Sequence, residues 1–238
     1  MKEKIIDKIR LILQKGSDNK TRESSSRFFK KGEKALVYGV KTAQVHKIAK
    51  EFLEQIKTYS KEDIFAICEE LWKSKYLEEA IVACKFTESL KNQYEPSDFK
   101  VFEGWVNKYV NNWADCDTLC NHTIGTFIMM YPEYLSELKK WAKSHNRWTK
   151  RASAVTLIIP ARRGLFLEEV FEIADTLLLD NDDIVQKGYG WMLKAASESN
   201  QKEVFDYVLS KKEVMPRTAL RYAIEKMPIE LKTMAMRK

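Results

Sequence analysis

The chain has 238 residues, enough for one large domain or two small ones, with a core that needs neither disulfides nor metals. Apolar residues make up 45% and charged residues 32% of it, and a mean hydropathy of −0.43 excludes a membrane protein. Six tryptophans and eleven phenylalanines argue against global disorder, and eight glycines with five prolines are too few for a turn-rich β-sandwich.

The net charge of +7 is unevenly distributed along the chain. Residues 1–50 contain fourteen Lys or Arg and five Asp or Glu, and a second basic run between Lys139 and Arg163 contains eight cations and no acid. Clustered cations gain affinity for polyanions by releasing counterions, so a polyanionic partner is favoured over a merely solvated basic surface.

A 3.6-residue apolar period predicts helices throughout, and no segment alternates at period two. The first helix is predicted around Ile5, Ile9 and Ile12, and the polar residues 16–26 that follow it are predicted to form a mobile loop, either closing over a ligand or lying plainly on the surface. Two further helical faces consist of Val45, Ile48, Ala49, Phe52 and Ile56, and of Ile64, Phe65, Cys68, Leu71 and Trp72.

A degenerate repeat follows in the C-terminal half. Segments beginning at Arg151, Lys187 and Arg217 each open with a cation and continue with small and apolar residues, 36 and 30 residues apart. Such spacing is typical of stacked helical pairs, so we predict an all-α solenoid; an irregular helical bundle is the alternative.

The four cysteines are predicted to be reduced thiols, because four in so long a chain do not form a disulfide framework. Cys116, Cys120 and His122 have metal-ligating side chains, but the sequence near them lacks a fourth ligand at zinc-like spacing. We therefore predict no metal and no organic cofactor. The chain opens directly into an amphipathic pattern, so we also expect neither a signal peptide nor a membrane span and place the protein in a bacterial-type cytosol or nucleoid, hence cytoplasmic.

The segment Asn111–Asp117 contains one tryptophan and two carboxylates just before an apolar helical stretch. Asp115 or Asp117 would make a good N-cap for that helix, because a carboxylate accepts from free backbone N–H groups. On composition alone, capping is the favoured role. The chain lacks a Gly-rich phosphate loop, an HExxH pair and a Gly-x-Ser-x-Gly elbow, which leaves the common nucleotide, zincin and hydrolase classes without support.

Five segments spread over most of the chain form a combined pattern: Tyr38–Lys50, Leu71–Ser74 with Glu78–Ala80, Trp113–Asp117, Asn146–Ala152 and Lys187–Trp191. Together they resemble the AlkD-like DNA alkylation repair glycosylases, which are built from HEAT-like helical repeats; the last three segments are the specific ones. The resemblance implies a right-handed α-solenoid of degenerate HEAT-like helical-pair repeats with a concave basic face, formed by residues 1–238 as a single domain. It also implies a catalytic set of Asp117, Trp113 and Trp191, and DNA-binding cations Arg151, Lys150, Arg147 and Lys187.

The implied reaction is hydrolysis of the N-glycosidic bond of cationic N3- or N7-alkylated purines, such as 3-methyladenine and 7-methylguanine, in duplex DNA, which leaves an abasic site. Alkylation makes the base a cationic leaving group, so one carboxylate can suffice where ordinary glycoside hydrolysis uses two. Asp117 would stabilise the oxocarbenium-like sugar, and the faces of Trp113 and Trp191 would attract its developing charge. The family is understood to act without base flipping, and a monomer facing a duplex needs no second copy.

The sequence is also compatible with other roles for these residues and with other functions for the protein. Both tryptophans could be packing residues of the repeats, Arg151 could pair with an acid on a neighbouring helix, and Asp115 is the rival carboxylate. A non-catalytic DNA-binding paralogue and a protein-binding scaffold are the alternative functions.

Overall fold

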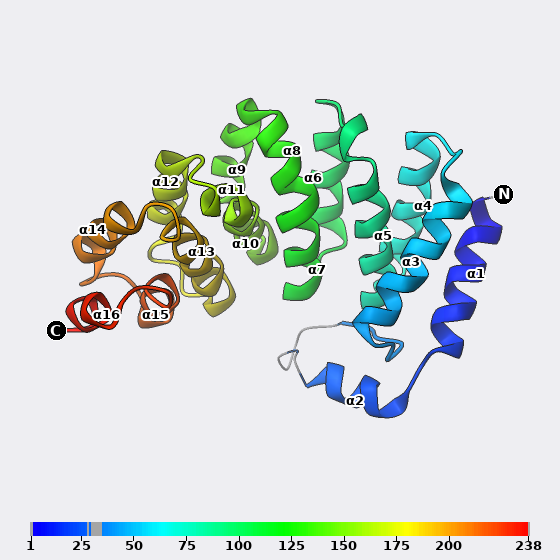
Figure 1. Ribbon diagram of the computed structural model, residues 1–238, viewed down its shortest axis with the longest axis horizontal. Helices are drawn as coiled ribbons and strands as arrows, with labels where there is room; N and C mark the ends of the chain where they lie inside the picture. Colours follow the sequence, from blue (N-terminus) through cyan, green and yellow to red (C-terminus); the bar gives the residue numbers. More distant parts are fainter. Residues whose placement is uncertain (1, 28, 30–34, 238) are drawn as a thin grey trace. The chain divides into compact units, whose positions relative to one another are not determined.

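The computed structural model describes residues 2–27, 29 and 35–237, and its regular structure is helical (Figure 1). Helices account for 74% of the chain, and the described residues contain one isolated bridge, between Leu36 and Tyr76, but no strand. The predicted all-α helical-repeat class is confirmed. Its right-handed twist, its concave basic face and the single domain over 1–238 stay predictions.

Two compact units divide the described chain, residues 1–119 and 120–238. The first contains α1 (Lys2–Lys15), α2 (Asn19–Ser26), α3 (Thr42–Ile56), α4 (Lys61–Lys73), α5 (Leu77–Ser89), the 3₁₀ turn η1 (Lys91–Gln93), α6 (Asp98–Lys108) and α7 (Trp113–Thr118). A π-helical stretch, η2 (Leu119–Ile124), follows α7. The second contains α8 (Gly125–Met130), η3 (Pro132–Tyr134), α9 (Leu135–Trp141), α10 (Arg147–Val155), α11 (Ile158–Arg162), α12 (Leu167–Leu177), α13 (Asp183–Ala196), α14 (Gln201–Lys211), α15 (Arg217–Ala223) and α16 (Ile229–Met236).

In the first unit, α3 packs on α5 and α5 on α7, while α4 covers α5. All five apolar residues predicted for the second helical face are buried in α3, as expected for a stripe at spacings of three and four. The first helix differs from its prediction. Its buried stripe runs through Ile9 to Leu13, which leaves Ile12 on the flank with 38% of its surface exposed.

The predicted loop over residues 16–26 is wrong for residues 19–26, which form α2. The Asp18 carboxylate caps this helix by accepting from the Thr21 backbone N–H at 2.8 Å. Gly39 (φ +90°) lies so close to α2 that a Cβ there would be 2.6 Å from the Asp18 carbonyl oxygen, so only glycine fits. The Asp18 cap and the close contact with Gly39 stabilise α2, which could not be predicted from its polar sequence alone.

Two buried glutamates attach the segment around Gly39 to the start of α5. The Glu78 carboxylate accepts from three consecutive backbone N–H groups, those of residues 38–40, at 2.8 to 3.1 Å. The Glu79 carboxylate accepts from the Tyr38 hydroxyl at 2.7 Å and pairs with Arg10 of α1 at 3.1 Å. Because each carboxylate is fully used by donors, both charges are tolerated inside the unit.

In the second unit, α10 packs on α13 and α13 packs on α15. These helices contain the three segments from which the repeat was predicted, so the periodicity corresponds to stacked equivalent helices. Gly190 of α13 makes the closest approach. A Cβ there would lie 2.7 Å from the Tyr222 Cβ and 2.8 Å from the Ala219 carbonyl oxygen of α15.

All four cysteines, Cys68, Cys84, Cys116 and Cys120, are buried and free, as predicted for reduced thiols. The described residues contain no group of three His, Cys, Asp or Glu side chains that could hold a metal ion. None of the described helices is long and apolar enough to cross a membrane.

Candidate functional site

Helix α7 begins with a cap that differs from the predicted one. Asn112 is the N-cap: its Oδ1 accepts from the Asp115 backbone N–H at 2.9 Å, and its Nδ2 donates to the Asp115 carboxylate. The prediction that Asp115 or Asp117 caps the helix is therefore wrong. Asparagine is as good an N-cap residue as aspartate. Because Asn112 occupies the N-cap position directly before the first helical residue, Trp113, neither aspartate is needed as the cap.

The two aspartates of α7 occupy different environments. Asp115 is 3% exposed, and burial raises the pKa of its carboxyl to about 7, opposed by the Asn112 hydrogen bond and reinforced by the charge of Glu78. One of its carboxylate oxygens, Oδ1, is buried with no hydrogen-bond partner among the described residues. Asp117 is half-buried, as is Trp113 one turn before it. Of the two aspartates, Asp117 is the more exposed residue.

The buried carboxyl of Asp115 makes stability depend on pH. Its folded pKa lies above its unfolded value, so the folded state holds the proton more tightly, and stability falls as pH rises from about 4 to about 7. We expect the unfolding free energy of Asp115→Asn, relative to wild type, to increase across this range by on the order of 1 kcal/mol per pH unit. Urea unfolding at half-unit pH steps measures it, with Asp7→Asn on the exposed face of α1 correcting for general charge effects. A pH-independent difference would contradict the assignment.

Arg151 lies on α10 and is 5% exposed. Its Nη1 donates to the Ile184 carbonyl oxygen of α13 at 2.6 Å. A Cβ on Gly188 would be 3.3 Å from the Arg151 Cγ, so the glycine of α13 provides the room in which the arginine side chain lies. The Lys-Gly-Tyr-Gly-Trp segment is recognisable in the sequence, but the space that its first glycine, Gly188, leaves for Arg151 is visible only in the fold.

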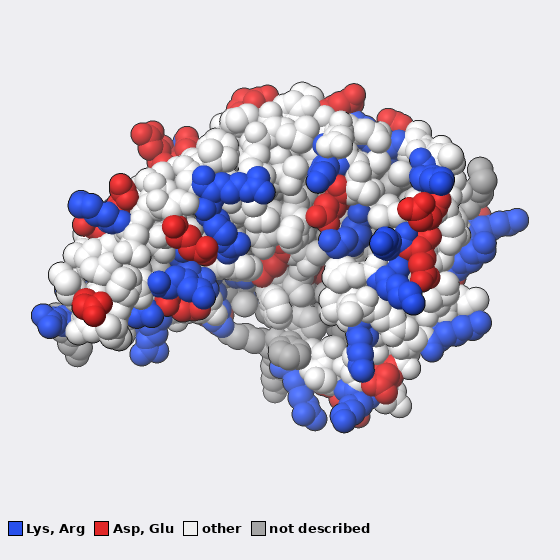
Figure 2. Space-filling model, viewed as in Figure 1, with Lys and Arg blue, Asp and Glu red and all other residues white. Residues whose placement is uncertain are grey.

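The other predicted DNA-binding cations are paired with acids from one short segment, Asp180–Asp183. Arg147 pairs with Asp182 at 2.7 Å, Lys150 with Asp180, and Lys187 with Asp183 at 3.2 Å. Figure 2 likewise shows acidic side chains lying beside many of the basic ones on the face that it presents. These pairs were not predicted. The acids that pair with Arg147 and Lys150 lie 35 and 30 residues later in the sequence, whereas Asp183 lies one helical turn before Lys187. Three aspartates in four positions were the available signal.

Each unit therefore holds part of the predicted set. Trp113 and Asp117 lie together on α7 in the first unit, and the Phe29 ring lies 6.1 Å from the Trp113 ring, a neighbour that no periodicity predicts. The second unit holds Arg151, Lys150 and Arg147 on α10 and Lys187 and Trp191 on α13. Trp191 is half-buried, one turn after Lys187. Neither tryptophan is a fully enclosed core residue.

In a comparison with known protein families, residues 9–227 match the family described as DNA alkylation repair enzyme. The chain belongs to that family. A solved structure described as a predicted DNA alkylation repair enzyme from Enterococcus faecalis shares the fold, with a TM-score of 0.79 and 16% identity over 90% of this chain and 97% of that one. No curated protein sequence matches. As a member of the DNA alkylation repair enzyme family, the protein has a role in DNA repair, with DNA as its partner.

Proposed function

We propose that the protein is a DNA glycosylase that hydrolyses the N-glycosidic bond of cationic N3- and N7-alkylated purines in duplex DNA and leaves an abasic site. The observation that carries the proposal is the pair on α7: Trp113 and Asp117 stand one turn apart, both half-buried, in a chain of the DNA alkylation repair family. An aromatic face and a carboxylate both stabilise a positively charged sugar.

Stabilising a positively charged sugar takes an ionised carboxylate that the substrate can reach. Asp115 is unsuited, because it is buried and its pKa is raised to about 7. Asp117 would stabilise the oxocarbenium-like sugar as the bond to the base lengthens and would orient the attacking water. The alkylated base already carries positive charge, so it departs without protonation by a second carboxyl group.

The remaining predicted residues would hold the DNA around the reacting nucleotide. Trp191, on the second unit, would offer the DNA another aromatic face, which attracts positive charge developing on a sugar. Arg151 is buried and donates to the Ile184 carbonyl, so its proposed contact with a phosphate beside the lesion requires its guanidinium to become exposed when DNA binds. Lys150, Arg147 and Lys187 would contact the backbone further along. Cleavage without base flipping would let the lability of the cationic lesion supply the selectivity.

The test is release of methylated bases from a duplex that contains N-methylpurines, compared with an unmodified duplex of the same sequence. We expect 3-methyladenine and 7-methylguanine to be released from the first and no base from the second. Salt-dependent binding to both duplexes without release would instead identify a non-catalytic DNA-binding member of the family. Weak, salt-independent binding to both would identify a protein-binding scaffold.

A further inference from the structure

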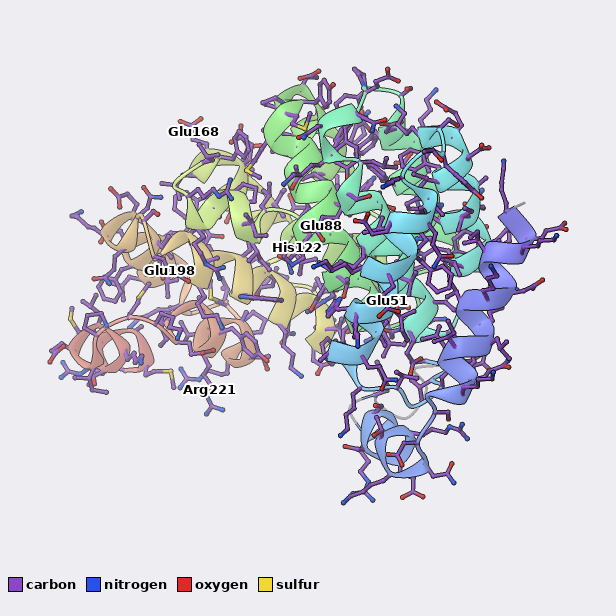
Figure 3. All side chains as sticks on the ribbon, turned by 45° about the vertical axis from the view of Figure 1, so that its right-hand side comes forward. Glu51, Glu88, His122, Glu168, Glu198 and Arg221 are labelled. Atoms are coloured by element: carbon purple, nitrogen blue, oxygen red, sulfur yellow. The ribbon has the colours of Figure 1, made fainter. Side chains whose placement is uncertain are left out.

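Helix α15 carries two exposed arginines, Arg217 and Arg221, four residues apart on one face. Neither has an acid partner among the described residues. The nearest acid at helical spacing, Glu225, is engaged by Lys194 of α13 at 2.9 Å. In Figure 3 the labelled side chain of Arg221 extends from α15 into solvent. These two cations differ from Arg147, Lys150 and Lys187, each of which has its own aspartate.

The exposed face of α15 adjoins the face of α13 that carries Trp191. Positions 187, 191 and 194 lie at spacings of four and three on α13, and Lys194 reaches across to α15, where its Nζ lies 5.6 Å from the centre of the Tyr222 ring. Gly190 brings the two helices into close contact. The row of residues 187, 191 and 194 on α13 therefore lies beside the row of residues 217 and 221 on α15. The Lys194–Glu225 ion pair joins the two rows.

We propose that Arg217 and Arg221 form a phosphate-binding strip for the backbone of duplex DNA, adjoining the face of α13 that carries Trp191. Four residues of helix rise about 6 Å, close to the roughly 7 Å that two nucleotide steps of one strand rise, so the two guanidinium groups can engage two phosphates of one strand. Arginine forms bidentate hydrogen bonds with phosphate and stays charged at any physiological pH.

The absence of acid partners makes this strip more effective per residue than the paired cations. A phosphate that binds Lys187 replaces Asp183, so part of the attraction is lost with the broken pair. A phosphate that binds Arg217 or Arg221 displaces only water and mobile ions. The inference rests on DNA as the partner and not on base release.

The experiment compares two double variants that each remove two positive charges. Arg217→Gln/Arg221→Gln changes the strip. Lys100→Gln/Lys108→Gln is the matched control, since these two lysines of α6 are also exposed, have no acid partner in the described chain and lie outside both basic segments. The dissociation constant for an unmodified duplex is measured between 50 and 200 mM salt. Thermal unfolding confirms that both proteins are folded.

We expect the slope of log affinity against log salt to decrease by about 2 in the arginine variant, close to 0.9 for each lost phosphate contact, and by less than about 0.5 in the control. Arg217→Lys/Arg221→Lys should restore most of the slope. An unchanged slope in the arginine variant, or equal losses in both variants, overturns the strip. If wild-type protein binds DNA but releases no base, the glycosylase proposal is refuted and the phosphate-binding strip is unaffected. If base is released but the slope of the arginine variant is unchanged, the strip is refuted and the glycosylase proposal is unaffected.

Discussion

An Asp117→Asn protein is expected to bind alkylated duplex DNA with near wild-type affinity and to release the methylated purine at least a hundredfold more slowly. The amide keeps the size and most hydrogen-bonding capacity of the carboxylate but removes the negative charge that, under the proposed mechanism, would face the developing cation. Loss of such a group appears in the rate of the chemical step and not in binding. Single-turnover release at saturating protein measures that step directly.

Asp115→Asn is the control for this experiment. The substitution removes a carboxylate from the same helix, two residues away, but from a buried position. We expect its release rate to stay within about tenfold of wild type, because the amide can still bond to Asn112 at the cap. The opposite ranking, with Asp115→Asn inactive and Asp117→Asn active, would show that the buried carboxyl carries the chemistry.

Gly190→Ala is expected to lower the free energy of unfolding by about 2–3 kcal/mol. Alanine normally stabilises a helix relative to glycine by about 1 kcal/mol, but here the new methyl group would lie 2.7 Å from the Tyr222 Cβ and 2.8 Å from a backbone oxygen of α15. Backbone cannot move aside as a flexible side chain can. Helices α13 and α15 must therefore move apart at this contact. Urea unfolding measures the resulting decrease in the free energy of unfolding.

Gly104→Ala on α6 provides the matched comparison. It is also a helical glycine, but a Cβ there would meet no described atom within 4 Å. We expect this substitution to stabilise the protein by about 0.5–1 kcal/mol, the ordinary helix-propensity gain. The same substitution, glycine to alanine in a helix, should thus lower the free energy of unfolding at position 190 and raise it at position 104. A neutral or stabilising effect of Gly190→Ala would show that α13 and α15 do not pack so closely.

The features that could be predicted from the sequence are those that repeat locally. The apolar stripe of α3 was predicted residue by residue, and the segments opening at Arg151, Lys187 and Arg217 coincide with three stacked helices. Both patterns arise because each helix buries one face against its neighbours.

The features that could not be predicted depend on contacts between distant segments. Helix α2 is polar throughout and is fixed by Gly39, twenty residues from its start. The acids that neutralise the basic residues of α10 lie on the next repeat, and the room for Arg151 comes from Gly188. The cap of α7 was missed for another reason: Asn, Asp and Ser cap helices almost equally well, so composition alone does not choose among adjacent candidates.

The burial of all four cysteines matters in a cell whose DNA is under attack by methylating agents. Such electrophiles also react with sulfur, and the reactive form is the thiolate. Burial raises the pKa of the Cys68 thiol to about 12, so almost none of it is ionised at neutral pH, and the other three sulfur atoms are enclosed as well. A protein of the alkylation repair family thus exposes no cysteine to the same reagents that create the damage in DNA, and it can remain intact while the damage accumulates.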